Sequence, residues 1–440
     1  MKSSSPSVGI VGGGVLGMTL SLRLAEAGLN VTLFESSEAL GGVASSCRIG
    51  DYVWDRFYHV ILMSDSHLLD LIGELGLKDE LIWGITKTGF YADGKLYSVS
   101  NAIEYLLFPP LNIRDKLRLG WTILYASRIK NWKRLETISS ADWLVRHSGR
   151  RTFDKLWLPL LKSKLGGDYR LASAAFIWAH IARLYAARRS GLKKEMFGYI
   201  KGGYRTFIEA LRLRLEEKGV SILQGTRVSM VREDGSGVLI ETGKGTALRV
   251  DKAVLTVPCP QVLELCPQLT PQEKSRLRSV VYQDLICAVF LLKTPLSGFY
   301  TTNIAADSIP FTGVIEMTAL VDKAHFGGHS LVYLPRYMTK ADPFVNESNE
   351  AIKDRFFSSL RAIHPELAAE ELVAYHISRI SDFPFIPTLH YQEKSLPASN
   401  TSLKRVFVVN SAQIVNGTNN INESVRLANK KAAALTPLLI

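Results

Sequence analysis

The chain contains 440 residues, 47% of them hydrophobic and 21% charged, which excludes an intrinsically disordered protein and a single small domain. Its formal net charge of +12 at pH 7 suits nucleic acid, an anionic membrane surface or an acidic substrate. No nucleic-acid-binding motif accompanies the charge, so nucleic acid is not expected as a partner. The longest apolar stretches are shorter than the ~18 residues of a membrane span, and no secretory signal opens the chain. We therefore expect a cytoplasmic protein of two or three domains, with peripheral membrane contact as an option.

The first 35 residues follow the order strand, glycine loop, helix, strand. Residues 7–11 are a short apolar run that predicts a buried strand. Residues 16–27 carry Leu, Met and Ala at helical spacing and stop at Gly28, a good helix terminator. Residues 30–34 predict a second strand, which Glu35 ends. The four pieces together predict a βαβ unit.

A glycine motif, Gly12-x-Gly14-x-x-Gly17, occupies the first turn of this unit. Gly12 permits the tight turn, Gly14 lets a pyrophosphate approach the backbone, and Gly17 lets the helix pack on the strand. The free N–H groups and positive dipole end of the helix, at Val15 and Leu16, would face the phosphates. The motif alone is weak, but its place between a strand and a helix predicts a dinucleotide site.

Glu35 stands where a carboxylate would accept hydrogen bonds from a ribose 2′-OH, which disfavours NADP as the ligand. A second glycine pair, Gly41 and Gly42, follows it in the stretch SSEALGGVASS. The region resembles the FAD-dependent amine oxidase, protoporphyrinogen oxidase and phytoene desaturase superfamily, to which UDP-galactopyranose mutase is related. The resemblance implies that Ser36, Gly41, Gly42 and Val43 run along FAD.

Three later segments carry the same resemblance in the same order. Residues 201–231 look like the family's central segment, with Val228 over the adenine, and residues 251–260 look like its return strand, which includes Val257. Residues 405–435 look like the last FAD motif, in which a strand leads through a glycine loop into a helix. The residues that would face the flavin there are Asn410, Gly417, Thr418 and Asn419. Ala39 and Val43 depart from the family's usual arginines, and Asn410-Ser411 from its usual Gly-Asp.

The resemblance implies an α/β fold, with a Rossmann-type FAD-binding domain, a helical insertion and a mixed-sheet substrate domain. The FAD-binding domain is expected from residues 1–63, 197–268 and 386–440. Residues 64–196 are mostly helical in period and would form the cap, and residues 269–385 carry apolar β runs that would form the sheet.

Candidate catalytic residues cluster after the second glycine pair, in GDYVWDRFYHVI. His59 could donate a hydrogen bond near the flavin or act as acid or base, and otherwise is a histidine satisfied by a backbone carbonyl. Arg56 and Tyr58 are weaker candidates. Lys164, in WLPLLKSKLGG, could hold an anionic substrate group or a water beside the flavin, and otherwise is a surface lysine.

The segment RDKLRLGWTILYASRIKNWKR mixes apolar residues with Lys and Arg at both ends. This pattern has two interpretations. The helix could lie on an anionic membrane surface and admit a lipid-soluble substrate, or it could be a cap helix with a solvated basic face. No metal is expected, because the four cysteines (Cys47, Cys259, Cys266 and Cys287) form no CxxC pair and no histidine cluster has zinc spacing. The cysteines are expected to be small buried hydrophobes in a reducing compartment.

Two enzymatic functions remain open, beside a third class, a flavin-binding protein with no catalysis. One is an FAD-dependent oxidoreductase that removes a hydride from a C–H or C–N bond of an apolar or amphipathic small molecule and passes the electrons to oxygen or another acceptor. The other is a non-redox use of the flavin, in a sugar-nucleotide mutase of the UDP-galactopyranose mutase type. The substrate and the oligomeric state have no readable motif.

Overall fold

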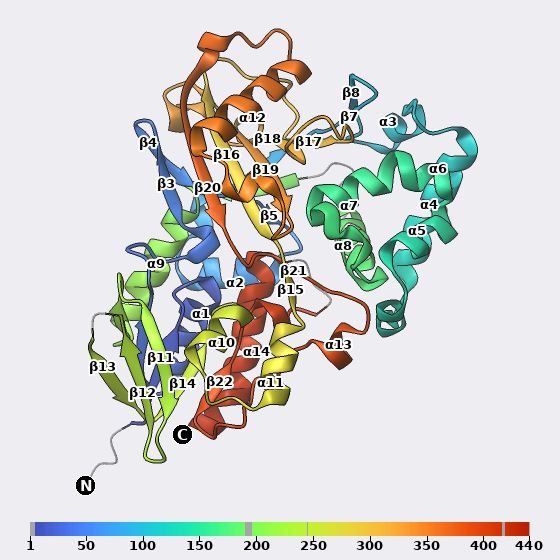
Figure 1. The fold of residues 1–440 in the computed structure, drawn as a ribbon. Helices are drawn as coiled ribbons and strands as arrows, with labels where there is room; N and C mark the ends of the chain where they lie inside the picture. The colour runs from blue at the N-terminus through green and yellow to red at the C-terminus, as the bar shows by residue number, and fades with distance from the viewer. Residues whose placement is uncertain (1–4, 190–195, 244, 416–418, 440) are drawn as a thin grey trace.

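The structure is a computed structural model that describes residues 5–189, 196–243, 245–415 and 419–439. A five-stranded parallel sheet forms its lower part in Figure 1, in the order β10-β2-β1-β14-β22. Its strands are β1 (Ser7–Val11), β2 (Asn30–Phe34), β10 (Ser221–Leu223), β14 (Lys252–Leu255) and β22 (Val406–Val408). They come from three distant parts of the chain. The sheet therefore cannot be completed until all three parts meet.

Strand β1 lies in the middle of the sheet. The next strand in the chain, β2, pairs on one side of it and the later strand β14 on the other, so the strand order switches at β1. A crevice opens at the carboxyl ends of the strands at such a switch point. Helix α1 (Val15–Glu26) starts there and is buried on almost every side, because it packs against the sheet, α9 (Tyr204–Glu217) and α14 (Ile421–Leu439). The fold thus places the first glycine loop at the crevice.

A seven-stranded sheet forms the upper part of the molecule in Figure 1, in the order β20-β16-β19-β18-β17-β7-β8. Its β7–β17 pair is parallel and its other pairs are antiparallel. All nine residues of β16 are buried, with α12 (Asn349–Ile363) packed against it. The strands are β7 (Thr88–Ala92), β8 (Lys95–Ser98), β16 (Asp284–Leu292), β17 (Thr301–Ile304), β18 (Gly313–Glu316), β19 (Ser330–Met338) and β20 (Leu372–Ile380).

A group of helices lies beside the mixed sheet, at the right of Figure 1. Its core contains large buried side chains such as Trp143, Phe153 and Leu161. The helices are α3 (Ala102–Leu107), α4 (Ile113–Arg128), α5 (Ser140–Ser148), α6 (Arg150–Thr152), α7 (Leu158–Leu165) and α8 (Ala174–Arg189), with a π-helical turn at Phe153–Trp157. With these helices and the mixed sheet, the α/β fold predicted from the sequence is confirmed.

Residues 81–98 differ from the mostly helical expectation for the insertion. They form β6 (Leu81–Ile85), β7 and β8; β6 pairs with β9 (Met196–Ile200), and β7 joins the mixed sheet through β17. Gly84 and Gly89 lower the helix propensity of this stretch, and its partner strands lie far away in the sequence. A local period could not reveal those partners.

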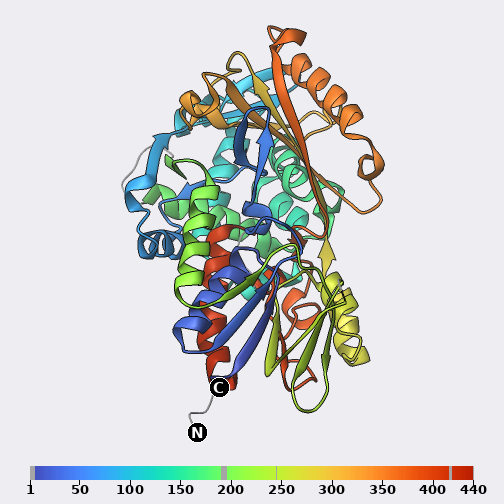
Figure 2. The same ribbon diagram turned by 90° about the vertical axis from the view of Figure 1, so that its left-hand side faces the viewer.

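Short elements complete the molecule, and Figure 2 shows the small sheet of β11, β12 and β13, in yellow-green, at the lower end beside the parallel sheet. The strands are β3 (Ser46–Ile49), β4 (Tyr52–Asp55), β5 (Ile61–Leu62), β11 (Val228–Glu233), β12 (Val238–Thr242), β13 (Ala247–Val250), β15 (Val281–Tyr282) and β21 (Phe385–Ile386). The helices are α2 (Ser66–Glu74), α10 (Cys259–Leu265), α11 (Pro271–Arg278) and α13 (Tyr391–Lys394). Within the described residues, no helix has the length and apolar character needed to cross a bilayer.

Candidate active site

The first glycine loop is shaped by close contacts at two of its glycines. Gly12 has φ +116°, and a Cβ there would lie 2.5 Å from the Thr256 hydroxyl. A Cβ at Gly17 would lie 1.9 Å from the carbonyl oxygen of Gly12, so the helix can approach the strand only without a side chain. By contrast, a Cβ at Gly14 would meet no heavy atom within 4 Å outside its chain neighbours. The loop therefore leaves open space at Gly14.

The N-terminus of α1 opens into that space. Its N-cap residue is Gly14, no side chain caps the helix, and its first turn holds no acid. The first-turn N–H groups of any α-helix lack partners inside the helix, and the helix dipole gives this end a partial positive charge. Val15 and Leu16 are themselves buried, so they offer the backbone rather than their side chains. These features suit a pyrophosphate.

Glu35 holds the loop through its carboxylate. Its Oε2 accepts the Gly13 N–H at 2.8 Å, and its Oε1 accepts the Ser37 N–H at 2.8 Å and the Ser36 hydroxyl at 3.3 Å. A carboxylate has about two lone-pair sites on each oxygen, so Oε2, which accepts one hydrogen bond, can still accept another. The contacts orient the carboxylate and leave it capacity for a ribose hydroxyl.

The second glycine loop lies against the first. Gly41 donates its N–H to the Gly13 carbonyl at 2.9 Å and forms a parallel bridge with Gly14. Both Gly41 and Gly42 have positive φ, at +103° and +59°. A Cβ at Gly42 would lie 3.3 Å from the Gly14 Cα, so the two backbones approach closely. Two adjacent bare backbones suit the long diphosphate and ribityl parts of FAD.

Val228 approaches the same region from the central segment. The Thr226 N–H bonds the Glu35 carbonyl at 2.8 Å, and Val228 follows two residues later, buried at the start of β11. This arrangement places Val228 beside the acid, where the resemblance puts the adenine.

The return strand and the last motif meet at the crevice through Asn410. Its amide Nδ2 donates to the Val257 carbonyl at 3.0 Å, whereas its buried Oδ1 has no partner. Val257 lies close to the first loop, 3.2 Å from a Cβ built at Gly12. An unpaired buried oxygen costs free energy unless a ligand or water satisfies it. Asn410 is thus suited to contact a bound group.

Asn419 repeats this pattern, since its Nδ2 donates to the Phe385 carbonyl at 3.2 Å and its buried Oδ1 is unpaired. The predicted flavin contacts Gly417 and Thr418 lie outside the described residues. The donor set, the open space at Gly14 and the two orphan amide oxygens fit FAD.

Thr256 is a site residue that the sequence reasoning missed. Its hydroxyl donates toward the carbonyls of Val11 at 2.9 Å and Gly12 at 3.0 Å, and so clamps the first loop to the return strand. The sequence signal that could have identified Thr256 is a hydroxyl residue directly after the return strand.

Replacing Glu35 with glutamine should weaken FAD binding about tenfold, because charge-assisted bonds to the loop and ribose are lost. Titration of the apoprotein with FAD, followed by flavin fluorescence, gives the dissociation constant. The matched control is Glu38→Gln, since Glu38 is an exposed glutamate three residues later. Equal affinity for Glu35→Gln and wild type would contradict the assignment.

His59 contacts the second glycine loop rather than standing free. Its Nε2 lies 3.0 Å from the Val43 carbonyl, and because a carbonyl can only accept, Nε2 carries the proton. Burial lowers the pKa of His59, which keeps the ring neutral at neutral pH. Its Nδ1 remains an acceptor. The arrangement suits a residue that positions the loop carrying Val43.

Tyr58 and Lys164, two predicted catalytic candidates, are brought together with Tyr337. Lys164 Nζ donates to the Tyr58 hydroxyl at 3.0 Å, and the hydroxyls of Tyr58 and Tyr337 are 3.2 Å apart. Lys164 also lies over both rings, 5.4 and 5.9 Å from their centroids. Burial raises the pKa of Tyr58 to about 12 and that of Tyr337 further, so both hydroxyls stay protonated.

Arg56 faces a different group of residues. Its guanidinium lies 5.7 Å from the Phe57 ring centroid, near Cys47 and His376. Burial raises the pKa of Cys47 to about 11 against a smaller opposing effect of the Arg56 charge. Tyr58 and Lys164 are therefore in direct contact, whereas Arg56 lies beside Phe57, Cys47 and His376.

Asp55, next to these candidates, was also missed. The side chain of Asp55 is buried, and its Oδ1 accepts the Tyr204 N–H at 2.8 Å at the start of α9. Its backbone carbonyl accepts the Tyr333 hydroxyl at 2.7 Å. The N-cap of α9 is Gly203, which has no side chain of its own, so Asp55 supplies the missing cap. Burial raises the pKa of Asp55 to about 8.

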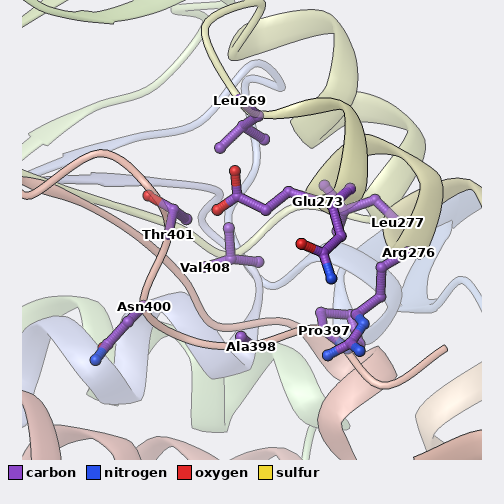
Figure 3. Close-up of a pocket in the computed structure, with 10 residues that line it drawn as sticks. Leu269, Glu273, Arg276, Leu277, Pro397, Ala398, Asn400, Thr401 and Val408 are labelled. Carbon is purple, nitrogen blue, oxygen red and sulfur yellow. The ribbon is translucent and has the colours of Figure 1, made fainter. Parts of the chain in front are cut away.

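A separate hollow of about 240 Å³ lies between α11 and residues 397–401 (Figure 3). Glu273 there already bonds Thr270 and Ser402, and Arg276 donates to the Glu393 carbonyl. No residue of either glycine loop lines it. The hollow is therefore distinct from the crevice. Glu273 and Arg276 already have partners within the protein, so the hollow is not a candidate for the active site.

Comparison with known proteins adds family information to this geometry. The sequence model of the family described as flavin containing amine oxidoreductase matches residues 17–435. The chain is 22% identical over 427 residues to zeta-carotene desaturase from Synechocystis sp., across 85% of this chain and 86% of the relative. It is 24% identical over 320 residues to coproporphyrinogen III oxidase from Mycobacterium leprae, across 68% and 70% of the two chains.

A solved structure from Exiguobacterium sp. 255-15, named for protoporphyrinogen oxidase, superimposes with a TM-score of 0.78. The match covers 99% of each chain at 19% identity. At this identity the likeness speaks for the fold alone.

Proposed function

The chain belongs to the family of flavin containing amine oxidoreductases and is an FAD-dependent oxidoreductase, and we propose that it removes a hydride from a C–H or C–N bond of an apolar or amphipathic small molecule. The electrons pass on to oxygen or another acceptor. A sequence relative is named a desaturase and another an oxidase, which favours net oxidation of carbon. The cytoplasm is the compartment we propose, in keeping with four free thiols.

The chemistry that FAD supplies when bound is acceptance of a hydride from carbon. The residues proposed to hold it are those of the crevice. They are Gly12, Gly14, Val15, Leu16, Gly17, Glu35, Ser36, Gly41, Gly42, Val43, Val228, Val257, Asn410 and Asn419, with Gly417 and Thr418 added from the sequence. The two glycine loops hold the diphosphate by backbone groups, and Glu35 binds the ribose. His59 keeps the second loop in place through the Val43 carbonyl.

The observation that carries the proposed substrate class is the Lys164–Tyr58–Tyr337 cluster. It combines one cation with aromatic rings, and the Tyr58 ring lies 6.4 Å from that of Tyr333. Aromatic faces suit an apolar body, whereas a lysine and two protonated hydroxyls suit an anionic or carbonyl group. We propose that Lys164 and Tyr58 orient the polar end of the substrate and so fix which carbon is oxidised.

The test is anaerobic mixing of the yellow holoprotein with a panel of compounds, while the flavin absorbance at roughly 450 nm is followed. A porphyrinogen, a carotene, an aliphatic amine and UDP-galactopyranose represent the classes. Bleaching by one of the first three supports the proposal. Turnover of the sugar nucleotide only after the flavin has been reduced in advance, with no net bleaching, would favour the mutase instead.

Replacing Lys164 with methionine should slow anaerobic flavin reduction about 10- to 100-fold, because the substrate loses its orienting donor. Stopped-flow absorbance, with the panel compound that bleaches the wild type, gives the rate constant. Lys162→Met is the matched control, because Lys162 pairs with Asp307 instead of the tyrosines. Flavin content should be unchanged in both variants. Equal slowing in both would contradict a role for Lys164.

A further inference from the structure

Helix α4 exposes its largest apolar side chains to solvent. Ile113, Leu117, Trp121 and Tyr125 recur every four residues along one face, with between 40% and 68% of their surface exposed. Its buried residues are Asp115, Leu119, Thr122 and Ala126, and Ile123 is partly buried against the same core. In a helix that merely covers a core, the large apolar residues face inward. Helix α4 therefore carries a second apolar stripe, on its outer face, that packing against the core does not explain.

Helix α3 packs beside α4 and extends the apolar area. Its Ile103 and Leu107, also four residues apart, are 69% and 72% exposed. Single exposed apolar residues are ordinary on protein surfaces, but a contiguous set on two neighbouring helices marks an interaction site. Both helices lie at the outer edge of the helical insertion in Figure 1.

The charge around this area is strongly positive. Residues 112–134 contain seven basic residues and one acidic residue, Asp115, which is buried and paired with Arg151. Arg114 and Arg128 are exposed in the first and last turns of α4, and Lys130, Lys133 and Arg134 are exposed in the segment that follows. A basic rim around an apolar stripe with a tryptophan is the composition of a helix that lies in a membrane interface.

We propose that the α3–α4 surface docks flat on an anionic lipid bilayer, with the four-residue stripe of α4 inserted at the headgroup level and the basic residues against anionic headgroups. A second copy of the chain is the other candidate occupant. Apposing two copies of this surface would bring the basic rims together without acidic partners, which charge repulsion disfavours. An anionic bilayer offers both the apolar depth and the opposite charge.

The docked orientation places lipid one helix away from the tyrosine–lysine cluster. Helix α4 packs against α8. His180 of α8 lies close to Lys164 of the cluster. Burial lowers the pKa of His180 to about 4, and the nearby Lys164 charge adds a smaller lowering effect. Docking itself does not depend on the proposed reaction, so it is tested without substrate.

The experiment is flotation of the full-length holoprotein with extruded vesicles. One set is phosphatidylcholine alone and the other contains roughly 30 mol% phosphatidylglycerol. We expect retention by the anionic vesicles, and at least a tenfold lower partition coefficient for Leu117→Gln/Trp121→Gln, because two large apolar side chains no longer insert. Raising the salt from about 50 to about 500 mM should also release the protein, because it screens the basic rim.

The matched control is Leu213→Gln, since Leu213 is an exposed leucine on a different helix, α9. Flavin content and the melting temperature of each variant show that it is folded. Absence of binding to anionic vesicles, equal binding to neutral ones, or full binding by the double variant would each overturn the proposal. So would a dimer in sedimentation velocity that the double variant abolishes, because a second copy would then cover the surface.

Discussion

Replacing Gly14 with valine is expected to give a folded protein that no longer retains FAD. A Cβ at Gly14 would meet no heavy atom within 4 Å outside its chain neighbours, and the backbone there has an ordinary φ of −71°. The fold therefore tolerates the substitution. The new methyl groups would fill the space at the N-terminus of α1, where the diphosphate would lie closest to the backbone. We expect at least a 100-fold increase in the dissociation constant for FAD.

The measurement is the ratio of flavin to protein absorbance after purification, followed by calorimetric titration of the apoprotein with FAD. Gly120→Val is the control, because a Cβ at Gly120, on the exposed face of α4, also meets open space. Apoprotein stability should be similar in the two variants. A yellow Gly14→Val protein with normal affinity would remove the first glycine loop from the site.

Replacing Asp55 with asparagine should remove a large part of the pH dependence of stability. The folded-state pKa of Asp55 is raised by burial to about 8, against a model-peptide value near ~3.9 for the unfolded chain. The folded state therefore holds a proton that the unfolded chain has released. The stability from this group is fully present below about pH 4 and is lost as the pH rises toward about 8. Asparagine keeps the oxygen that accepts the Tyr204 N–H and does not ionise.

The expected gain of Asp55→Asn over wild type is on the order of several kcal/mol at about pH 8.5 and much smaller near pH 4.5. Urea unfolding of the holoprotein at the two pH values measures it. Asp168→Asn is a suitable control, because burial also raises the pKa of Asp168 but its side chain is only partly buried. Parallel pH profiles for wild type and Asp55→Asn would show that the carboxyl of Asp55 has the same pKa in the folded and unfolded states.

Local sequence pattern predicted the parts of the site that are local in space. The βαβ unit, its glycine loop and Glu35 are contiguous, so strand, turn and helix signals were sufficient. The amine oxidase superfamily, the FAD cofactor and the oxidoreductase class, which rested on the resemblance, are confirmed by the family match over residues 17–435. The individual FAD contacts and catalytic residues remain predictions.

The features that the sequence missed depend on distant partners. Asp55 caps a helix that begins 149 residues later, and Thr256 clamps a loop at the other end of the chain. The pairing of β7 with β17 likewise joins segments that no local window compares. For α4, composition showed an amphipathic helix but could not tell which face is buried. Only the positions of α5 and α8 decide that its larger apolar side chains point outward.

The order of the parallel sheet has a consequence for biosynthesis. Strand β22 and helix α14, which pack against β14 and α1, follow all the other described elements in the chain. A nascent chain that already contains both glycine loops still lacks the Asn410 side of the crevice. FAD should therefore be captured only after β22 and α14 have been synthesised. Until then, β14 lacks the strand that pairs with its outer edge, and an unpaired strand edge favours aggregation of the incomplete chain.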